Sequence, residues 1–182
     1  MNFIGHALLS YRGNDDFLFG NLIADGIKGS DLGYLGGDLE AGVRWHRRVD
    51  AVIDQHPQVL ALLEQMPYRR VAGIALDIVW DHFLSQYELP EALAKRCYRL
   101  LSERPLPERL NRMLTHLVEG HWLERYADFG FTLSAIGGVG HRLRGENLLR
   151  ALIPWLETHY DELKASYQRL WPDIQHTLMY YP

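Results

Sequence analysis

The sequence contains a single cysteine, Cys97, among its 182 residues. One cysteine excludes an intrachain disulfide and a cysteine-based zinc cluster, so the chain is not a disulfide-stapled secreted scaffold. Long apolar runs are also missing, and no stretch of about 18 apolar residues predicts a transmembrane helix. The N-terminal segment lacks the basic and apolar regions of a signal peptide. We therefore expect a cytoplasmic protein with no membrane partner.

Lysine is scarce as well, with three residues against sixteen arginines. The formal net charge is −4 at pH 7, which argues against a general nucleic-acid binder. Arginine binds phosphate and carboxylate groups through two parallel hydrogen bonds, although it also suits structural ion pairs. The chain is 47% hydrophobic and 23% charged, a balance typical of a globular protein with a substantial core.

Helical periodicity extends along the whole chain, and no segment shows strand-like alternation bounded by turn signals. A cap at Asn14 predicts a first long helix that ends near Lys28, followed by a glycine-rich loop over 29–37. Further helices are expected at 38–55, from Pro57 to Met66, and at 68–87, 91–103, 107–125, 129–142 and 146–170. The prediction is an all-α fold, a helical bundle formed by one domain over residues 1–182.

Three predicted helices carry pairs of polar residues, four apart, beside or within apolar faces: Asn21 and Asp25, His46 and Asp50, and Asp77 and Asp81. Residues four apart project side by side from a helix. A buried carboxylate must be paired, protonated or bound to a metal, and several such groups meeting between helices form metal sites in helical domains. Mixed imidazole and carboxylate ligands suit Mn, Fe, Zn and similar divalent ions. Such an ion activates water and stabilises charge on a phosphoryl group.

A structural alternative stays open for each of these residues taken alone. A single buried aspartate such as Asp77 is more often the partner of an arginine, and a single His46 is more often a hydrogen-bonded core histidine. Three pairs together favour the metal site. His6 lies before the first long helix and is a further candidate ligand. His82 is either a co-ligand or a residue that hydrogen-bonds to a ligand.

Arginines near these pairs are candidates for substrate binding or charge stabilisation: Arg44, Arg47, Arg48, Arg69 and Arg70. The first three flank His46, where they would bind a phosphate by charge-assisted hydrogen bonds or form ordinary surface ion pairs. Arg69 and Arg70 open the helix 68–87, a position that the helix dipole disfavours for cations. They are expected to face an acidic partner or solvent.

Four segments occur here in an order and spacing that resemble those of the acyl carrier protein phosphodiesterases: MNFIGH, LFGNLIADGIKG, GVRWHRRVDAVIDQHP and RRVAGIALDIVWDHFL. A weaker likeness continues through HWLERYADFGF and LETHYDELKASYQRLWP. The resemblance implies an all-helical enzyme distantly related to the HD-type metal phosphohydrolases. It implies Mn²⁺-supported hydrolysis of the phosphodiester between 4′-phosphopantetheine and a serine of holo acyl carrier protein, an acidic protein.

The motifs of that family fall on the residues already singled out. Together, pattern and resemblance predict these metal ligands: His6, Asp25, His46, Asp50 and Asp77. The predicted catalytic residues are Asp81 and His82, as proton donors, and Arg47 and Arg48, which neutralise developing charge. The predicted substrate contacts are Asn21, Arg44, Arg69 and Arg70. Mn²⁺ is the expected cofactor, with Mg²⁺, Fe²⁺ or Zn²⁺ as alternatives.

Two other functions stay open from the sequence. An HD-like phosphohydrolase that acts on nucleotides or other small phosphoesters would use the same residues. A non-catalytic helical domain that binds carrier proteins would pair its buried aspartates with arginines and bind no stoichiometric metal. No feature of the sequence predicts an oligomeric state.

Overall fold

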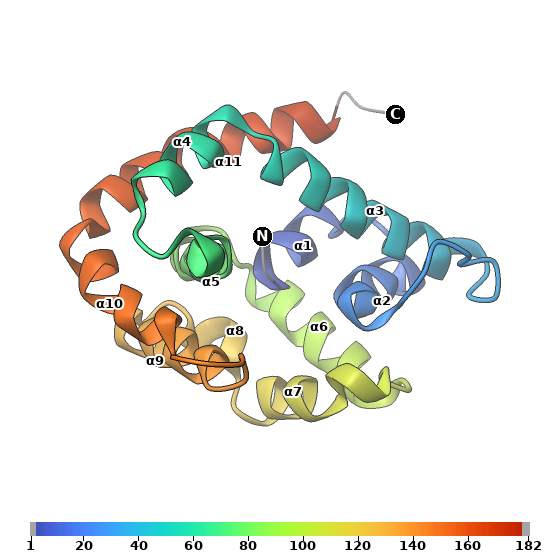
Figure 1. Cartoon of the computed structure of the whole chain (residues 1–182). Helices are drawn as coiled ribbons and strands as arrows, with labels where there is room; N and C mark the ends of the chain where they lie inside the picture. The colour runs from blue at the N-terminus through green and yellow to red at the C-terminus, as the bar shows by residue number, and fades with distance from the viewer. Residues whose placement is uncertain (1–2, 180–182) are drawn as a thin grey trace.

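Helices joined by short loops account for most of the computed structural model, which describes residues 3–179 (Figure 1). The elements are α1 (Phe3–Leu9), α2 (Asp15–Ile23), the 3-10 turn η1 (Ala24–Gly26), α3 (Gly37–Asp54), α4 (Pro57–Gln65), α5 (Arg69–Tyr87), α6 (Glu91–Glu103), α7 (Glu108–Glu119), α8 (Trp122–Arg125), α9 (Phe129–Gly140), α10 (Leu148–Thr158) and α11 (Tyr160–Met179). No strand occurs between residues 3 and 179, and the prediction of an all-α fold is confirmed.

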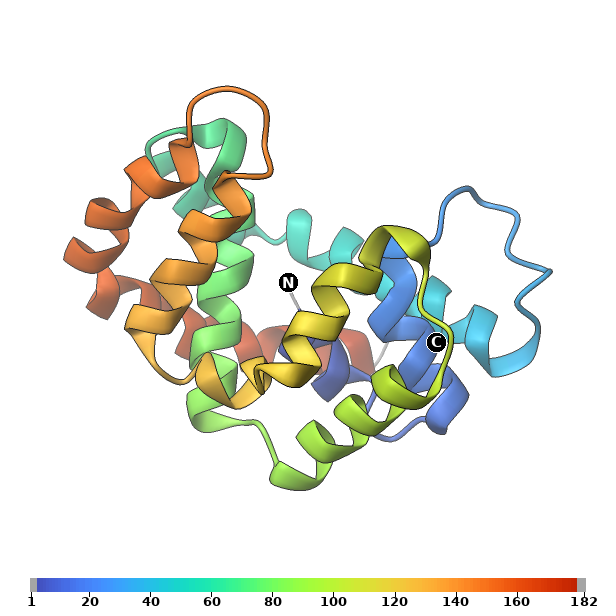
Figure 2. The ribbon, with the colours of Figure 1, turned by 90° about the horizontal axis from the view of Figure 1, so that it is seen from below.

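Helix α5 lies inside the fold, in contact with the earlier helices α1 and α4 and with the later helices α8 to α11 (Figure 1). Figure 2 shows α9 and α10 on one side of α5 and α2 and α3 on the other. This position explains why α5 is apolar on most sides: Trp80, Phe83 and Leu84 are fully or almost fully buried. The ring of Phe83 packs against Tyr160 and Tyr167 of α11, with centroids 5.5 and 5.3 Å apart. In the described part of the chain, no helix has both the length and the apolar character that a bilayer-spanning segment needs.

The structure differs from the sequence-based expectation at three helix ends. The first long helix ends at Ile23 and continues only as the turn η1, short of Lys28. The helix expected at 107–125 is two helices, α7 and α8, because His121 adopts a left-handed conformation with φ 49°. The helix expected at 146–170 breaks at His159, after which α11 runs on to Met179. Helix α1 had no predicted counterpart.

Two glycines allow α2 and α3 to pack with their backbones in contact. A Cβ atom on Gly20 would lie 2.2 Å from the carbonyl oxygen of Leu39, and one on Gly42 would lie 2.1 Å from that of Phe17. No other residue fits at such a close approach. The contact holds the end of α2, with Asn21, directly against α3.

Candidate metal centre

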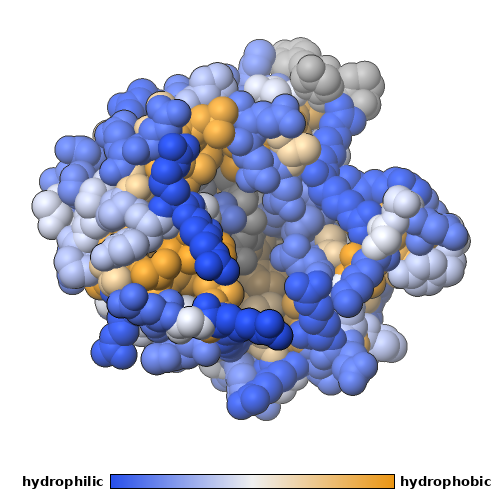
Figure 3. Space-filling model, in the orientation of Figure 1, coloured by the Kyte–Doolittle hydropathy of each residue, from blue (hydrophilic) through white to orange (hydrophobic). Residues whose placement is uncertain are grey.

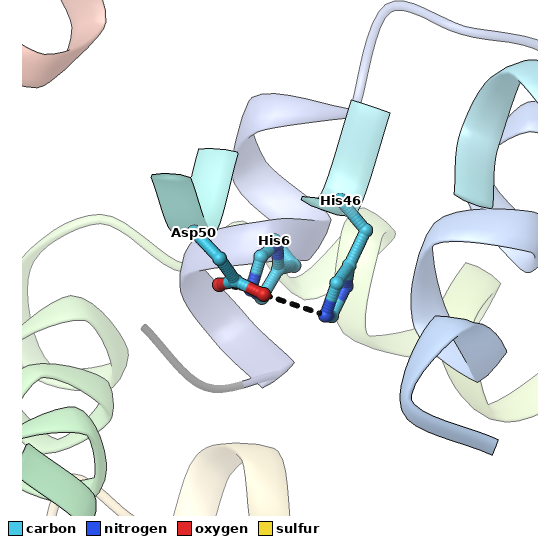
Figure 4. Close-up of side chains that lie close together, drawn as sticks. All are labelled: His6, His46 and Asp50. Carbon is cyan, nitrogen blue, oxygen red and sulfur yellow. Dashed lines mark hydrogen bonds and ion pairs between the residues drawn. The ribbon is translucent and has the colours of Figure 1, made fainter. Parts of the chain in front are cut away.

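Two histidines and an aspartate converge where α1 meets α3 (Figure 4). His6 comes from α1, and His46 and Asp50 come from α3, one turn apart. The two imidazole rings stack with centroids 3.7 Å apart and an interplanar angle of 12°. Asp50 Oδ1 lies 3.0 Å from His6 Nε2, and Asp50 Oδ2 lies 3.2 Å from His46 Nε2. One ligand atom from each residue lies within 4.8 Å of the others.

Asp25 brings a second carboxylate to the same point. It lies in η1, and its Oδ1 is 3.4 Å from His46 Nε2. The Asp25 side chain is 72% exposed, whereas that of His46 is 8% exposed. The cluster is therefore closed on the protein side by two imidazoles and open to solvent beside Asp25.

A buried amide fixes the orientation of the His46 ring. The Nδ1–H of His46 donates to Asn21 Oδ1 at 3.0 Å. The amide nitrogen of Asn21 donates to the carbonyl oxygen of His6, at 3.3 Å, and to the hydroxyl of Ser10. Because the oxygen of Asn21 can only accept, the proton of a neutral His46 stays on Nδ1 and the lone pair of Nε2 points into the cluster. Asn21, predicted as a substrate contact, lies behind the cluster.

Burial and neighbouring charges shift the pKa values of the residues in the cluster. Burial opposes charge on His46, but Asp25 and Asp50 outweigh it and raise its pKa to about 9. Burial lowers the pKa of His6 to about 4. Burial also opposes charge on Asp50, yet the two imidazoles hold its pKa well below the usual range. Two nitrogen ligands and two ionised carboxylates are a donor set that fits a divalent transition metal, which would replace the His46 proton.

Asp77 lies close to this cluster on α5. Burial raises its pKa, and the negative charges of Asp50 and Asp54 contribute to the rise. Asp77 also borders the large cavity described below. It stands beside the group formed by His6, His46 and Asp50 and stays a proposed further ligand.

Asp81, predicted as a proton donor, caps α1. Its Oδ1 accepts hydrogen bonds from the backbone N–H groups of Ile4, at 3.1 Å, and Gly5, at 3.4 Å. The side chain is fully buried, and burial raises its pKa to about 7. This carboxyl group therefore holds the short helix that carries His6, and proton donation by Asp81 stays a prediction.

Replacing Asp81 by asparagine is expected to flatten the pH dependence of stability. The pKa of Asp81 is about 7 in the folded protein and near 3.8 when unperturbed. The folded state thus binds the proton more tightly, so this stabilisation is complete below about pH 4 and is lost as the pH rises through 7. Between pH 4 and 8, the free energy of unfolding, measured with urea, should fall by a few kcal/mol more for the wild type than for Asp81→Asn. If the free energy of unfolding changed equally with pH in the two proteins, Asp81 would not titrate as a buried group.

His82, predicted as a co-ligand or proton donor, faces a different part of the fold. Its Nδ1 lies 2.8 Å from the carbonyl oxygen of Tyr126, and its Nε2 lies 2.9 Å from the hydroxyl of Tyr160. Its ring also packs against Phe129. Consecutive helical residues project about 100° apart, so Asp81 contacts α1 while His82 points elsewhere. The structure does not bring His82 into the cluster.

The arginines beside His46 are placed differently from one another. Arg47 donates to the carbonyl oxygens of Gly29, at 2.7 Å, and Ile27, at 3.0 Å. It thereby holds the segment that follows Asp25, and charge neutralisation by Arg47 stays a prediction. Arg44 pairs with Glu40 on the surface of α3.

The remaining candidate arginines are Arg48, which is half-buried, and Arg69 and Arg70, which are exposed at the start of α5. Substrate contact through these three arginines stays a proposal.

A cavity of about 540 Å³ lies beside the cluster, between α5, α7, α8 and α9. A small pocket at the cluster is bordered by His6, Asn21 and His46, and it shares Phe3 and Asp25 with the large cavity. The cavity thus reaches the edge of the cluster at Asp25.

Comparison with known proteins shows the family of this chain. The family model for acyl carrier protein phosphodiesterases matches residues 1–174. The chain belongs to the acyl carrier protein phosphodiesterase family. It is 36% identical to the acyl carrier protein phosphodiesterase of Photorhabdus laumondii, over 94% of this chain and 92% of the relative. Its identity to the proteins of that name from Yersinia enterocolitica and Klebsiella pneumoniae is 33%, over at least 94% of each chain. No solved structure matches.

This member of the acyl carrier protein phosphodiesterase family has cavity residues that sequence reasoning missed. They are Phe3, Arg109, Met113, Trp122, Phe131 and Arg142. The apolar ones have the spacing of ordinary core residues, and the arginines carry no motif, so no local signal distinguishes them. Only the tertiary arrangement of α1, α7, α8 and α9 around one cavity brings them together.

Proposed function

We propose that this chain hydrolyses the phosphodiester between 4′-phosphopantetheine and a serine of holo acyl carrier protein. We further propose that a divalent metal ion bound by His6, His46 and Asp50 supports the reaction. The observation that carries the proposal is the convergence of two imidazole nitrogens and one carboxylate in a chain of this family. The family supports the substrate, and the cluster supports the metal.

The proposed metal is Mn²⁺, held by the three clustered residues and by Asp25, with Asp77 beside them. When bound, a divalent ion lowers the pKa of a water molecule and stabilises charge on a phosphoryl group. The protein's own contribution is to keep both carboxylates ionised, the form that binds a cation. A hydrogen bond with His46 is the main reason why the pKa of Asp25 is lowered. Burial opposes the charge of Asp50, but its hydrogen bonds with His46 and His6 outweigh burial and lower its pKa.

The proposed reaction is a hydrolysis and needs no oxidant or reductant. The oxygen of water bonds to phosphorus, and the bond between phosphorus and the serine oxygen breaks. One proton of the water ends on the serine oxygen, which gives apo acyl carrier protein, and the other is released. Free 4′-phosphopantetheine is the second product. Asn21 orients His46, and Asp81 holds the helix of His6, so both act through the ligands that they position.

Intact-mass measurement of the carrier protein tests this function. The purified chain is incubated with holo acyl carrier protein and Mn²⁺, with and without a chelator, beside a panel of mono- and dinucleotides. We expect the carrier to lose the mass of phosphopantetheine only when metal is present. Hydrolysis of nucleotides with an unchanged carrier mass would contradict the proposal and identify a metal phosphohydrolase of different specificity.

Salt is expected to slow the reaction with the carrier protein. An acidic carrier is attracted by exposed arginines such as Arg69 and Arg70, and this attraction is screened by added ions. Raising NaCl from 50 to 500 mM should lower kcat/KM for holo carrier protein about ten-fold. A small phosphodiester should change less than about two-fold, because it carries little charge to steer. The double variant Arg69→Ala/Arg70→Ala should be less sensitive to salt, and equal salt sensitivity of both substrates would refute the steering.

A further inference from the structure

The large cavity next to the metal-binding residues has a mostly apolar wall. Helices α5, α7 and α9 and the segment around α8 supply it, and Figure 3 shows hydrophobic residues in the hollow near the middle of this face. The main apolar lining residues are Ile74, Ile78, Met113, Trp122, Phe131 and Val139. A volume of about 540 Å³ lies within the range of sites that bind small molecules.

Polar groups are few in this wall and lie among apolar neighbours. Arg109 on α7 and Arg142, just after α9, offer guanidinium groups, whereas the hydroxyl of Ser134 donates to the carbonyl oxygen of Gly130 within α9. Asp25 and Asp77 border the cavity on the side of the metal-binding cluster. The cavity is therefore anionic near the cluster, where a cation would bind, and carries hydrogen-bond donors elsewhere.

We infer that this cavity binds the pantetheine arm of the substrate, an assignment that rests on the proposed function. The phosphodiester must lie at the cluster, so the arm that extends from it needs a space that borders the cluster. The cavity meets this condition through Phe3 and Asp25, which also line the small pocket at His6 and His46. The dimethyl group of the arm suits the apolar wall, and its hydroxyl and amide oxygens suit the guanidinium donors of Arg109 and Arg142.

Gly138 provides a direct way to fill the cavity. It lies on α9 and lines the cavity, and a Cβ atom added there meets no other atom within 4 Å. Gly138→Trp therefore places a large side chain at the cavity without a steric clash at its Cβ. Gly138→Ala is the matched control, because it changes the same backbone position and leaves most of the space open.

Pantetheine, which has no phosphate, is the probe for this assignment. Its binding to the full chain is followed by NMR titration, and kcat/KM for holo carrier protein is measured on the same variants. We expect Gly138→Trp to weaken pantetheine binding and to lower kcat/KM, each at least ten-fold, and Gly138→Ala to have a much smaller effect on both. Circular dichroism and the unfolding midpoint establish that both variants are folded.

The outcomes separate this assignment from the proposed function. Pantetheine binding by the wild type that Gly138→Trp leaves unchanged would overturn the assignment, as would a wild type that binds no pantetheine. Full kcat/KM in Gly138→Trp would likewise place the arm elsewhere. Pantetheine binding that is lost only in Gly138→Trp, in a chain that leaves holo carrier protein intact, would support the cavity assignment while the proposed function fails.

Discussion

Replacing His46 by alanine is expected to lower kcat/KM for holo acyl carrier protein by about a thousand-fold or more. The Nε2 atom of His46 faces both carboxylates of the cluster, Asp50 at 3.2 Å and Asp25 at 3.4 Å. Its removal takes away one nitrogen ligand and leaves two anions without their cationic partner. Asp50→Asn should have an effect of similar size, since it removes the carboxylate that joins His46 to His6.

His56→Ala is the matched control for this loss. His56 pairs with Asp173 at 3.0 Å, so it is also a histidine–aspartate pair between helices, but it lies between α4 and α11. Steady-state kinetics with Mn²⁺ in excess should leave His56→Ala within about three-fold of the wild type. If His46→Ala retained wild-type kcat/KM while folded, His46 would have no part in the reaction.

Adding one methyl group at Gly42 is expected to destabilise the fold by about 3 kcal/mol. The Cβ atom of Gly42→Ala would lie 2.1 Å from the carbonyl oxygen of Phe17, so α2 and α3 must move apart. Asn21 lies on α2 and Asp25 directly after it, and both contact His46 of α3. The same displacement should therefore also weaken metal binding, which links a packing defect to the site.

Gly73→Ala separates this steric effect from helix propensity. Gly73 lies within α5, and a Cβ atom added there meets no other atom within 4 Å. Alanine at this position should raise the free energy of unfolding by about 0.5 to 1 kcal/mol, because glycine is the weaker helix former. Urea unfolding curves of both variants give the comparison. Equal stability of Gly42→Ala and Gly73→Ala would show that the backbones of α2 and α3 are not in close contact.

The sequence predicted the helical fold and part of the site for a physical reason. His46 and Asp50 interrupt an apolar face at a spacing of four, and an α-helix places such residues on one side without help from tertiary structure. The stretch that forms α5 was recognised because it is apolar on most sides. The sequence did not predict the hydrogen bond between Asn21 and His46, since this contact depends on how closely Gly20 and Gly42 let two helices approach.

Other features depend on tertiary contacts that no local pattern encodes. Helix α1 has only seven residues, too few to show a full amphipathic repeat, and it depends on Asp81 of α5 for its cap. Asp81 and His82 are adjacent, so the sequence suggested a shared role. In the structure, Asp81 contacts the backbone of α1, whereas His82 contacts the carbonyl oxygen of Tyr126. The cavity is lined by residues from six separate elements, α1, η1, α5, α7, α8 and α9, and the spacing of these residues along the chain does not differ from that of core residues.

A titration of Mn²⁺ followed by electron paramagnetic resonance tests the central claim most directly. The free ion gives a strong signal that falls when it binds, so stoichiometry is read on the wild type, His46→Ala and His56→Ala without any substrate. The account predicts stoichiometric binding by the wild type and by His56→Ala, and loss of tight binding in folded His46→Ala. Equally tight binding by His46→Ala would contradict it, because the metal would then lie outside the cluster of His6, His46 and Asp50.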